Sequence, residues 1–446
     1  MASNSSRKSG ANPVNARDRD FSHAWRALRH RNFRLFFGGQ SISLIGTWMT
    51  RIATSWLVYR LTKSSLLLGT VGFAGQIPTF LLAPFAGVVV DRIDRRKVLV
   101  WTQTLAMLQS FALAGLTLSH RITISEILAL SAFQGFINAF DMPGRQSFMV
   151  KMVETRDDLS NAIAINSSMV NMARLIGPSL AGLLIAATNE GWCFLVDGVS
   201  YIAVIASLLM MHLQRDSEPQ FQASMLAQLR AGWSYVSASA PIRTILLLFA
   251  LLSLMGWPFM VLMPIFAAQV LGGGPHTLGF LMGAVGVGSL VSALALVLRR
   301  SVRGLTRIIP FAALAFGTGL ICFGLSTSLA LSLALMLLTG FGMMQGLTAS
   351  NTILQTLVDE NMRGRVMSYY TMAFVGMAPF GSLLAGALAH AIGAPRTVIV
   401  SGVACILGAA WFWSRLPGIR KEMRPIYERL GIVPQSNLAI EESAES

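Results

Sequence analysis

The sequence predicts an all-α membrane protein with twelve transmembrane helices arranged as two six-helix bundles. Apolar residues make up 54% of the 446-residue chain and charged residues only 12%, whereas a soluble domain carries about a quarter charged residues. Runs such as 246–268 and 307–325 are long enough to cross a bilayer core, which takes roughly 20 helical residues. The alternation typical of an outer-membrane barrel is not visible in the sequence.

The expected spans follow the apolar runs along the chain. Most connections are short, but the one at 213–242 is long. In it Phe221, Met225, Leu229, Trp233 and Val236 recur at helical spacing, which predicts an amphipathic helix on the membrane surface or a simple linker helix. The twelve spans are 33–59, 66–90, 98–118, 125–148, 163–187, 192–212, 243–268, 277–298, 306–327, 329–355, 366–391 and 396–416.

The positive charge of the chain indicates its orientation in the membrane. A net charge of +15 would suggest nucleic acid in a soluble protein, but here we interpret it as a topology signal and expect no nucleic-acid partner. If the N-terminus is inside, 29 Lys and Arg lie at or beside inside segments and 4 lie in outside loops. By the positive-inside rule, both termini are predicted to be cytoplasmic in a bacterial inner membrane.

An internal repeat supports two similar halves. A shift of 205 residues superimposes 134–153 on 339–358, and 177–184 resembles 379–388. Repeats of this kind are typical of secondary transporters, whose substrate site lies between the halves. The predicted divisions are a cytoplasmic tail at 1–31, an N-terminal bundle at 32–212, a cytoplasmic linker with the amphipathic helix at 213–241, a C-terminal bundle at 242–416 and a cytoplasmic tail at 417–446.

A charged loop stands between the second and third spans, with the sequence GVVVDRIDRRK at 87–97. It resembles the signature loop of the major facilitator superfamily, except that Asp94 stands where the family usually has Gly. The resemblance implies that this loop holds the two bundles together on the cytoplasmic side in the outward-facing state, with Arg95 meeting an acid at the position of Asp141. A basic cluster that only sets topology is the alternative. The expected latch residues are Gly87, Asp91, Arg92, Arg95, Arg96 and Asp141.

A second motif, ARLIGPSLAG, occupies 173–182 in the fifth span. It is similar to the antiporter motif of the same superfamily, which is associated with exporters; Gly177, Pro178 and Gly182 match it. Pro178 lacks a backbone donor and bends the helix. The small residues are expected to pack the fifth span against the eighth, where Gly279, Gly283 and Gly286 are also small. Ordinary small-residue packing without bearing on direction is the alternative.

Segments 31–49, 138–148 and 359–368 look like the branch of the superfamily that includes enterobactin exporters and macrolide-efflux proteins. The resemblance covers roughly residues 30–416 and leaves the cargo open between siderophore and drug. It implies a monomer. Because the sequence has no Walker loop, metal-ligand cluster or nucleophile elbow, we expect neither a cofactor nor an enzyme.

Polar side chains inside the predicted spans are candidate functional residues, because an ionisable group in a bilayer costs several kcal/mol. Arg174 lies near mid-membrane and is expected to contact substrate or a carboxylate. Arg51 is flanked by aromatic residues, and a pair with Asp197 would lower the cost of burying both. Asp197 is the favoured carrier of a coupling proton, since such an acid must alternate between water and a dry site. The candidate pathway residues are Gln40, Arg51, Gln134, Asn138, Arg174, Asp197 and Gln345.

These features favour a secondary transporter that exports a small amphipathic molecule by alternating access, with protons as the expected coupling ion. A nutrient importer or lipid translocator on the same fold is one alternative. A non-transport membrane scaffold is another, although the polar residues inside the predicted spans argue against it.

Overall fold

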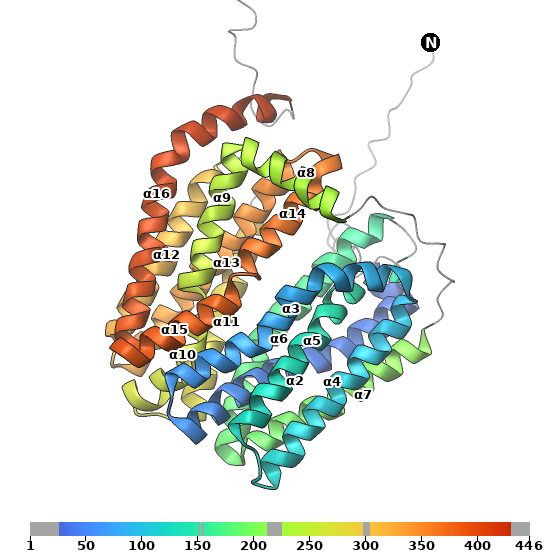
Figure 1. Cartoon of the computed structure of the whole chain (residues 1–446), viewed down its shortest axis with the longest axis vertical. Helices are drawn as coiled ribbons and strands as arrows, with labels where there is room; N and C mark the ends of the chain where they lie inside the picture. Colours follow the sequence, from blue (N-terminus) through green and yellow to red (C-terminus); the bar gives the residue numbers. More distant parts are fainter. Residues whose placement is uncertain (1–25, 150–151, 154–155, 212–224, 298–303, 430–446) are drawn as a thin grey trace, which may run out of the picture.

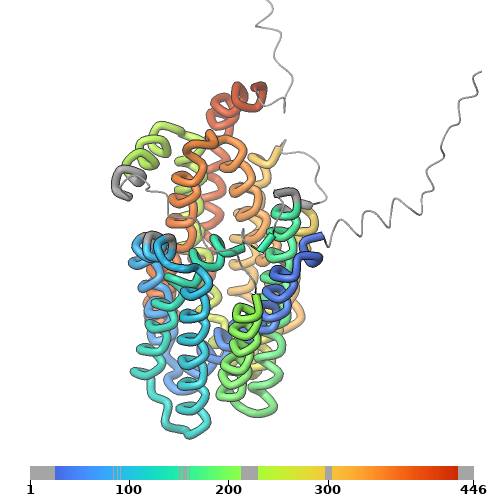
Figure 2. Tube along the Cα trace, turned by 90° about the vertical axis from the view of Figure 1, so that its right-hand side faces the viewer, coloured from blue at the N-terminus to red at the C-terminus, as the bar shows by residue number. Residues whose placement is uncertain are grey.

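The computed structural model describes residues 26–149, 152–153, 156–211, 225–297 and 304–429, and these are helical apart from short connections. Two groups of helices lean together at one end and spread toward the other (Figure 1). The described chain begins and ends toward the upper end in that view, which we call the termini face; the lower end is the opposite face. The 90° view shows the same bundles from the side (Figure 2).

The N-terminal group begins with a short 3-10 turn, η1 (Arg26–Arg29), and contains six long helices. Helix α2 packs mainly beside α6 and α7, and α5 packs beside α3 and α4. Helix α2 is separated from α6 and α7 by three or more helices in the sequence, so burial of helix faces against one another, not chain order, sets this contact. The six helices are α2 (Arg31–Thr62), α3 (Ser65–Arg92), α4 (Arg95–Leu118), α5 (Ile124–Met149), α6 (Arg156–Ala187) and α7 (Glu190–Met210).

The C-terminal group also contains six spans, two of them interrupted. Its first span is built from α9 (Ala240–Leu251), α10 (Phe259–Ile265) and two π-helical turns, and Pro258 and Pro264 lie within it. Its fifth span is divided between α14 (Glu360–Phe374) and α15 (Ala378–Ile392). The others are α11 (Pro275–Val297), α12 (Leu305–Leu325), α13 (Leu329–Leu357) and α16 (Ala394–Arg429).

The predicted all-helical membrane fold is confirmed. The helices differ, however, in whether their length and composition alone identify them as membrane spans. Within the described residues, ten helical segments are both long and apolar enough to cross a membrane. Helices α2 and α5 are not among them, although they have 32 and 26 residues. Both carry polar residues along their length, which lowers their mean hydropathy. Their packing within the N-terminal group nonetheless makes six spans in each half.

One helix at the termini face extends beyond its expected boundary, and the expected linker helix is present there. Helix α16 continues past the expected end at 416 to Arg429, because Ile419, Met423 and Tyr427 extend its buried face at four-residue spacing. The expected linker helix is present as α8 (Met225–Ala238). It packs on the C-terminal half, where the ring centroids of Trp233 and Tyr369 are 6.0 Å apart. Residues 212–224 lie outside the described residues.

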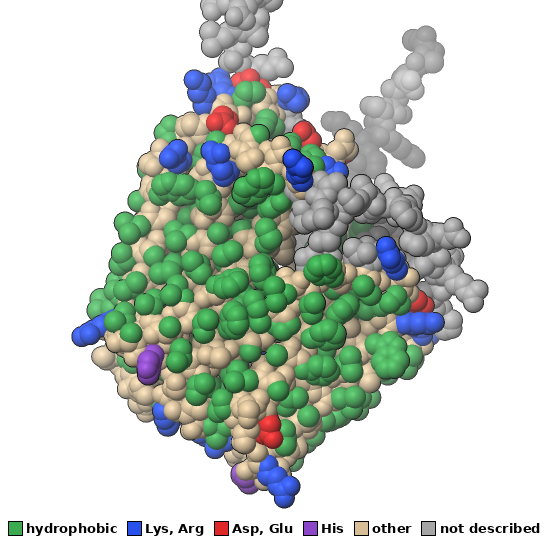
Figure 3. Space-filling view, viewed as in Figure 1, with side chains coloured by type: hydrophobic (Ala, Val, Ile, Leu, Met, Phe, Trp, Pro, Cys, Tyr) green, Lys and Arg blue, Asp and Glu red, His purple; other side chains and the backbone are tan. Residues whose placement is uncertain are grey.

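Hydrophobic side chains cover the middle of the molecular surface, while Lys and Arg gather toward its two ends (Figure 3). Large apolar residues such as Phe85, Trp101 and Leu407 expose 64–68% of their area. Such extensive apolar exposure is unfavourable in water but suits a surface that faces lipid.

An ion pair between α2 and α7 ties the N-terminal half together at the opposite face. Arg60 donates from Nε to Oε1 of Glu190 at 2.7 Å and from Nη2 to Oε2 at 3.1 Å. The Glu190 side chain is 2% exposed, whereas that of Arg60 is 48% exposed. The pair therefore satisfies a carboxylate that water cannot reach.

We expect Arg60→Ala to lower the thermal unfolding midpoint in detergent, because it leaves the buried Glu190 carboxylate without its donors. The loss should be about 1–3 kcal/mol in the free energy of unfolding. Arg424→Ala is the matched control, since Arg424 pairs with Glu428 one turn away while remaining 58% exposed, and such surface pairs contribute about 0.3–0.5 kcal/mol. Equal midpoints for the two variants would contradict the prediction.

Candidate functional site

The predicted latch loop begins the third span with a local hydrogen-bond cap. Asp94 is the N-cap of α4, and its Oδ1 accepts the backbone N–H of Arg96 at 2.9 Å. A capping acid explains why Asp replaces the usual Gly here. The Arg96 side chain donates to the carbonyl of Leu209 at 2.6 Å, at the end of α7. Thus Arg96 fastens the loop to its own half of the protein in this conformation.

The other expected latch residues lie at the termini face of the same half. Arg92 ends α3 and is exposed. Among the described residues, no atom of another helix lies within 4 Å of the position that a Cβ on Gly87 would take, so Gly87 makes no close contact with them in this conformation. The Asp91 side chain is outside the described residues, and Arg95 has a partner.

Asp141 is buried at the junction of α5 and α4. Its Oδ1 accepts hydrogen bonds from Thr102 at 3.0 Å and from Gln103 at 2.7 Å, and Arg145 pairs with it one turn along α5. The Asp141 side chain is 7% exposed. A carboxylate with three donors, one of them a cation, is firmly held in place.

The antiporter-like motif forms the contact between the two halves. A Cβ on Gly182 would lie 2.6 Å from the Pro275 carbonyl oxygen and 2.9 Å from Cα of Gly279, both in α11. In turn, Gly279 faces the carbonyl of Pro178. Helices α6 and α11 are therefore in backbone contact. The expected packing of the fifth span on the eighth is present in the structure.

A second contact between the halves joins α3 and α15 at the same face. The Cβ position of Gly69 lies 2.5 Å from the carbonyl of Ser382, and Gly386 approaches Gly69 equally closely. Gln76 Nε2 donates to Ser382 Oγ at 3.3 Å. Both contacts lie where α6 ends and α3 begins, toward the opposite face. The halves are thus pressed together there and spread toward the termini face (Figure 1).

Near the middle of α2 and α6, three side chains form what we call the arginine–tryptophan cluster: Trp48, Arg51 and Arg174. The Arg51 guanidinium carbon lies 4.8 Å from the Trp48 ring centroid, and that of Arg174 lies 5.3 Å from the same ring. Gly177 makes this possible, because a Cβ there would lie 2.5 Å from Cβ of Trp48. Removing that Cβ lets α6 approach α2 closely enough for both arginines to share one indole.

The two arginines lack a paired acid, although Arg174 is partly buried and Arg51 is exposed. Within the described chain, neither has a carboxylate within 4.0 Å, and Nε and Nη1 of Arg174 are buried without any hydrogen-bond partner. Helix α11 of the other half packs against the turn of α6 that carries Arg174, since the Cβ position of Gly286 is 3.2 Å from the Arg174 carbonyl oxygen. The cluster therefore places unpaired donors and positive charge where the two halves meet.

The suggested pair between Arg51 and Asp197 is not formed. Asp197, which is 1% exposed, accepts hydrogen bonds at Oδ2 from Thr50 at 2.8 Å and from Ser110 at 3.0 Å. Its Oδ1 is buried without a hydrogen-bond partner. Thr50 and Arg51 are neighbours, so their side chains point about 100° apart around the helix. Asp197 therefore faces the Thr50 side chain, whereas the Arg51 side chain lies over the Trp48 ring.

The remaining pathway candidates are distributed over three helices. Gln40 on α2 is buried. On α5, Gln134 donates to Asn138 at 3.2 Å, and on α13, Gln345 accepts from Ser292 of α11 at 2.7 Å. The structure does not gather them with the arginine–tryptophan cluster through any described hydrogen bond. Within the described residues, no group of three His, Cys, Asp or Glu side chains could hold a metal ion.

Sequence reasoning missed two participants, Trp48 and Thr50. From the sequence alone, Trp48 is equally consistent with an aromatic residue at the membrane interface. Only the approach of α6 brings a second arginine over its ring. The one available signal was the spacing of Trp48 and Arg51, which puts them on one helical face.

The model of the transmembrane secretion effector family matches residues 22–435, and the chain belongs to that family. Among curated proteins, it is 25% identical to the Staphyloferrin A transporter of Staphylococcus aureus, over 86% of this chain and 96% of that one. It is 24% identical to the multidrug efflux pump Tap of Mycolicibacterium fortuitum, over 81% and 90%. It is 27% identical to the enterobactin exporter EntS of Escherichia coli, over 85% and 89%.

The fold is also that of solved transporters. An inward-facing, unoccupied bacterial homologue of the lysosomal transporter Spinster superimposes with a TM-score of 0.66 at 13% identity, covering 92% of this chain and 99% of that one. Fold and family together define a multi-pass secondary transporter of the major facilitator superfamily, not an enzyme. The expected superfamily and its exporter branch are confirmed.

Proposed function

We propose that this protein exports a small amphipathic organic anion, either a siderophore or a drug, across a bacterial inner membrane. The arginine–tryptophan cluster carries the proposal. Its two guanidinium groups offer donors to an anionic group, and its indole offers an apolar face. The site lies beside α11 of the other half, where alternating access requires it. The names of relatives that handle staphyloferrin A, enterobactin and multiple drugs support this class of cargo.

We infer the orientation of the described conformation in the membrane from the charge asymmetry and the helix contacts. With both termini cytoplasmic, the opposite face is external, and the contacts at Gly182 and Gly69 close the external side. The described conformation is then inward-facing and ready to take cargo from the cytoplasm. The latch residues Gly87, Asp91, Arg92 and Arg95 would meet the other half when the termini face closes. A single chain provides both halves, and protons drive the cycle.

We expect Arg174→Ala to reduce transport of an anionic dye by roughly tenfold or more at subsaturating concentration, because a charge-assisted hydrogen bond contributes about 1.5–3 kcal/mol. The measurement is energised uptake into inside-out vesicles, which reports export from the cell. Uptake of a neutral dye of similar size should change little. The matched control is Arg121→Ala, since Arg121 is exposed in the loop between α4 and α5.

The same assay separates the competing functions. Dye uptake into inside-out vesicles indicates export, whereas loss of preloaded dye on energisation would indicate import. An Arg174→Ala variant that transports both dyes like wild type would contradict the proposed anion site. Absence of energised transport of any dye in the wild-type protein would favour a scaffold.

A further inference from the structure

A second arginine pair lies far from the arginine–tryptophan cluster, between α12 and α16 near the termini face. It lines a pocket of about 440 Å³, within the range of about 300–1,000 Å³ that is usual for small-molecule sites. We call it the Arg307–Arg420 pocket. Its walls come from the first turns of α12 and from the part of α16 around Pro417, and its lining residues are Arg307, Phe311, Trp413, Leu416, Pro417 and Arg420.

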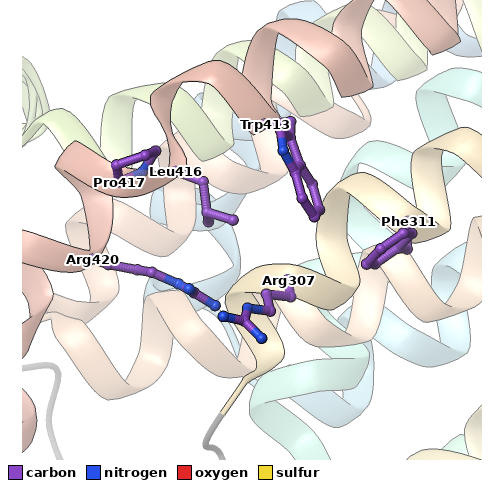
Figure 4. A pocket seen from close by; sticks show the side chains of 6 residues that line it. All are labelled: Arg307, Phe311, Trp413, Leu416, Pro417 and Arg420. Carbon is purple, nitrogen blue, oxygen red and sulfur yellow. The ribbon is translucent and has the colours of Figure 1, made fainter.

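The two arginines of this pocket point toward each other (Figure 4). Neither side chain has a hydrogen bond or ion pair with any described residue. Two like charges that face each other repel, and an anion between them would remove the repulsion while filling their donors.

The other walls of the pocket are apolar and aromatic. The rings of Phe311 and Trp413 meet edge to face with centroids 5.1 Å apart, and 55% and 47% of these residues is exposed. They lie one to two helical turns deeper in the spans than the arginines. The pocket is therefore charged at the membrane surface and apolar below it, which is the order of chemistry along a phospholipid.

The surroundings add to the positive charge. Arg415 and Lys421 are exposed on the same stretch of α16, together with the acid Glu422, while Arg424 is paired with Glu428. Basic pockets between transmembrane helices at the cytoplasmic surface are typical sites for acidic lipid headgroups, and each Lys or Arg near that surface contributes about 1 kcal/mol to the attraction. Trp413 is also the kind of residue that concentrates at the headgroup level.

We propose that the Arg307–Arg420 pocket binds an acidic phospholipid, with both guanidinium groups on its phosphate and an acyl chain against Phe311 and Trp413. The proposal is independent of the transported cargo, since these helices and residues are not those of the arginine–tryptophan cluster. Bound lipid would join the start of α12 to α16 at the termini face.

The test is native mass spectrometry of the full-length protein with added phosphatidylglycerol or phosphatidylcholine. Wild type should retain phosphatidylglycerol preferentially. The double variant Arg307→Gln/Arg420→Gln should bind phosphatidylglycerol roughly thirtyfold more weakly, with phosphatidylcholine binding unchanged. Arg121→Ala/Arg396→Ala removes two exposed cations from the opposite face and should bind like wild type. Equal loss in this control would overturn a specific pocket.

Two further measurements protect the result. Phosphatidylglycerol should raise the thermal unfolding midpoint of wild type but not of the double variant, while both have the same midpoint in phosphatidylcholine, which excludes misfolding. Inorganic phosphate is the second probe, because a free anion could use the same donors. If millimolar phosphate displaces phosphatidylglycerol completely, the pocket is a free-phosphate site and the lipid proposal fails. Retention of phosphatidylglycerol under those conditions supports it.

Discussion

Replacing Gly182 with valine is expected to shift the protein out of the described conformation by roughly 5- to 150-fold. The new Cβ would lie 2.6 Å from the Pro275 carbonyl and 2.9 Å from Cα of Gly279, and neither backbone atom can yield without separating the two halves. Overpacking of this kind costs about 1–3 kcal/mol, which corresponds to that population change. Because the contact exists only where the halves meet, the substitution destabilises this conformation without destabilising either bundle.

The shift can be measured as a distance between spin labels at Lys63 and Arg396, one in each half at the opposite face. Gly182→Val should populate a longer distance, and transport should fall because one state of the cycle becomes rare. Gly115→Val is the matched control, since no atom of another helix in the described part of the chain lies within 4 Å of its Cβ position on α4. A distance distribution identical to that of the control would contradict the prediction.

The same experiment tests the latch through Gly87. A Cβ on Gly87 is free of contacts in this conformation, whereas the proposed latch brings Gly87 close to the other half when the termini face closes. Gly87→Val should therefore shorten the average Lys63–Arg396 distance, or leave it short, even under conditions that open the opposite face in wild type. If Gly87→Val and Gly182→Val shift the population in the same direction, the loop does not act as the latch.

Contacts that depend on residue size were predictable where glycines recur at helical spacing on two spans, because such a pattern allows the two backbones to approach. Gly182 and Gly279 are such a case: each was identifiable as an interface residue, and their backbones meet in the structure. The capping role of Asp94 was equally local, yet it was overlooked because the family pattern has Gly there.

Interactions that depend on the rotation of one helix against another could not be predicted. Arg51 and Asp197 have the right charges and depth to pair, but α7 meets α2 through Thr50, one residue away from Arg51. The interruptions in the spans at 252–256 and 375–377 also follow from tertiary packing. For example, the Ser253 hydroxyl donates to the carbonyl of Phe374, which joins one interruption to the edge of the other.

Asp197→Asn is expected to abolish the coupling of transport to a proton gradient while leaving a folded, conducting protein. Asp197 is buried, and its carboxylate is held by the hydroxyls of Thr50 and Ser110 with no cation paired to it. Asp141, by contrast, is paired with Arg145. A coupling acid must change its protonation state as its site alternates between dry and wet, and asparagine keeps the shape and the hydroxyl partners but carries no exchangeable charge.

The measurement is accumulation of an anionic dye in inside-out vesicles with and without a pH gradient. In wild type the gradient should raise accumulation well above the undriven level, whereas in Asp197→Asn the two levels should coincide. Exchange of labelled for unlabelled dye needs no gradient, so its survival in the variant would show that cargo binding and alternation persist. Glu126→Gln is the control, because Glu126 only bonds the Thr123 cap at the exposed start of α5. A gradient response in Asp197→Asn equal to that of this control would exclude Asp197 as the coupling acid.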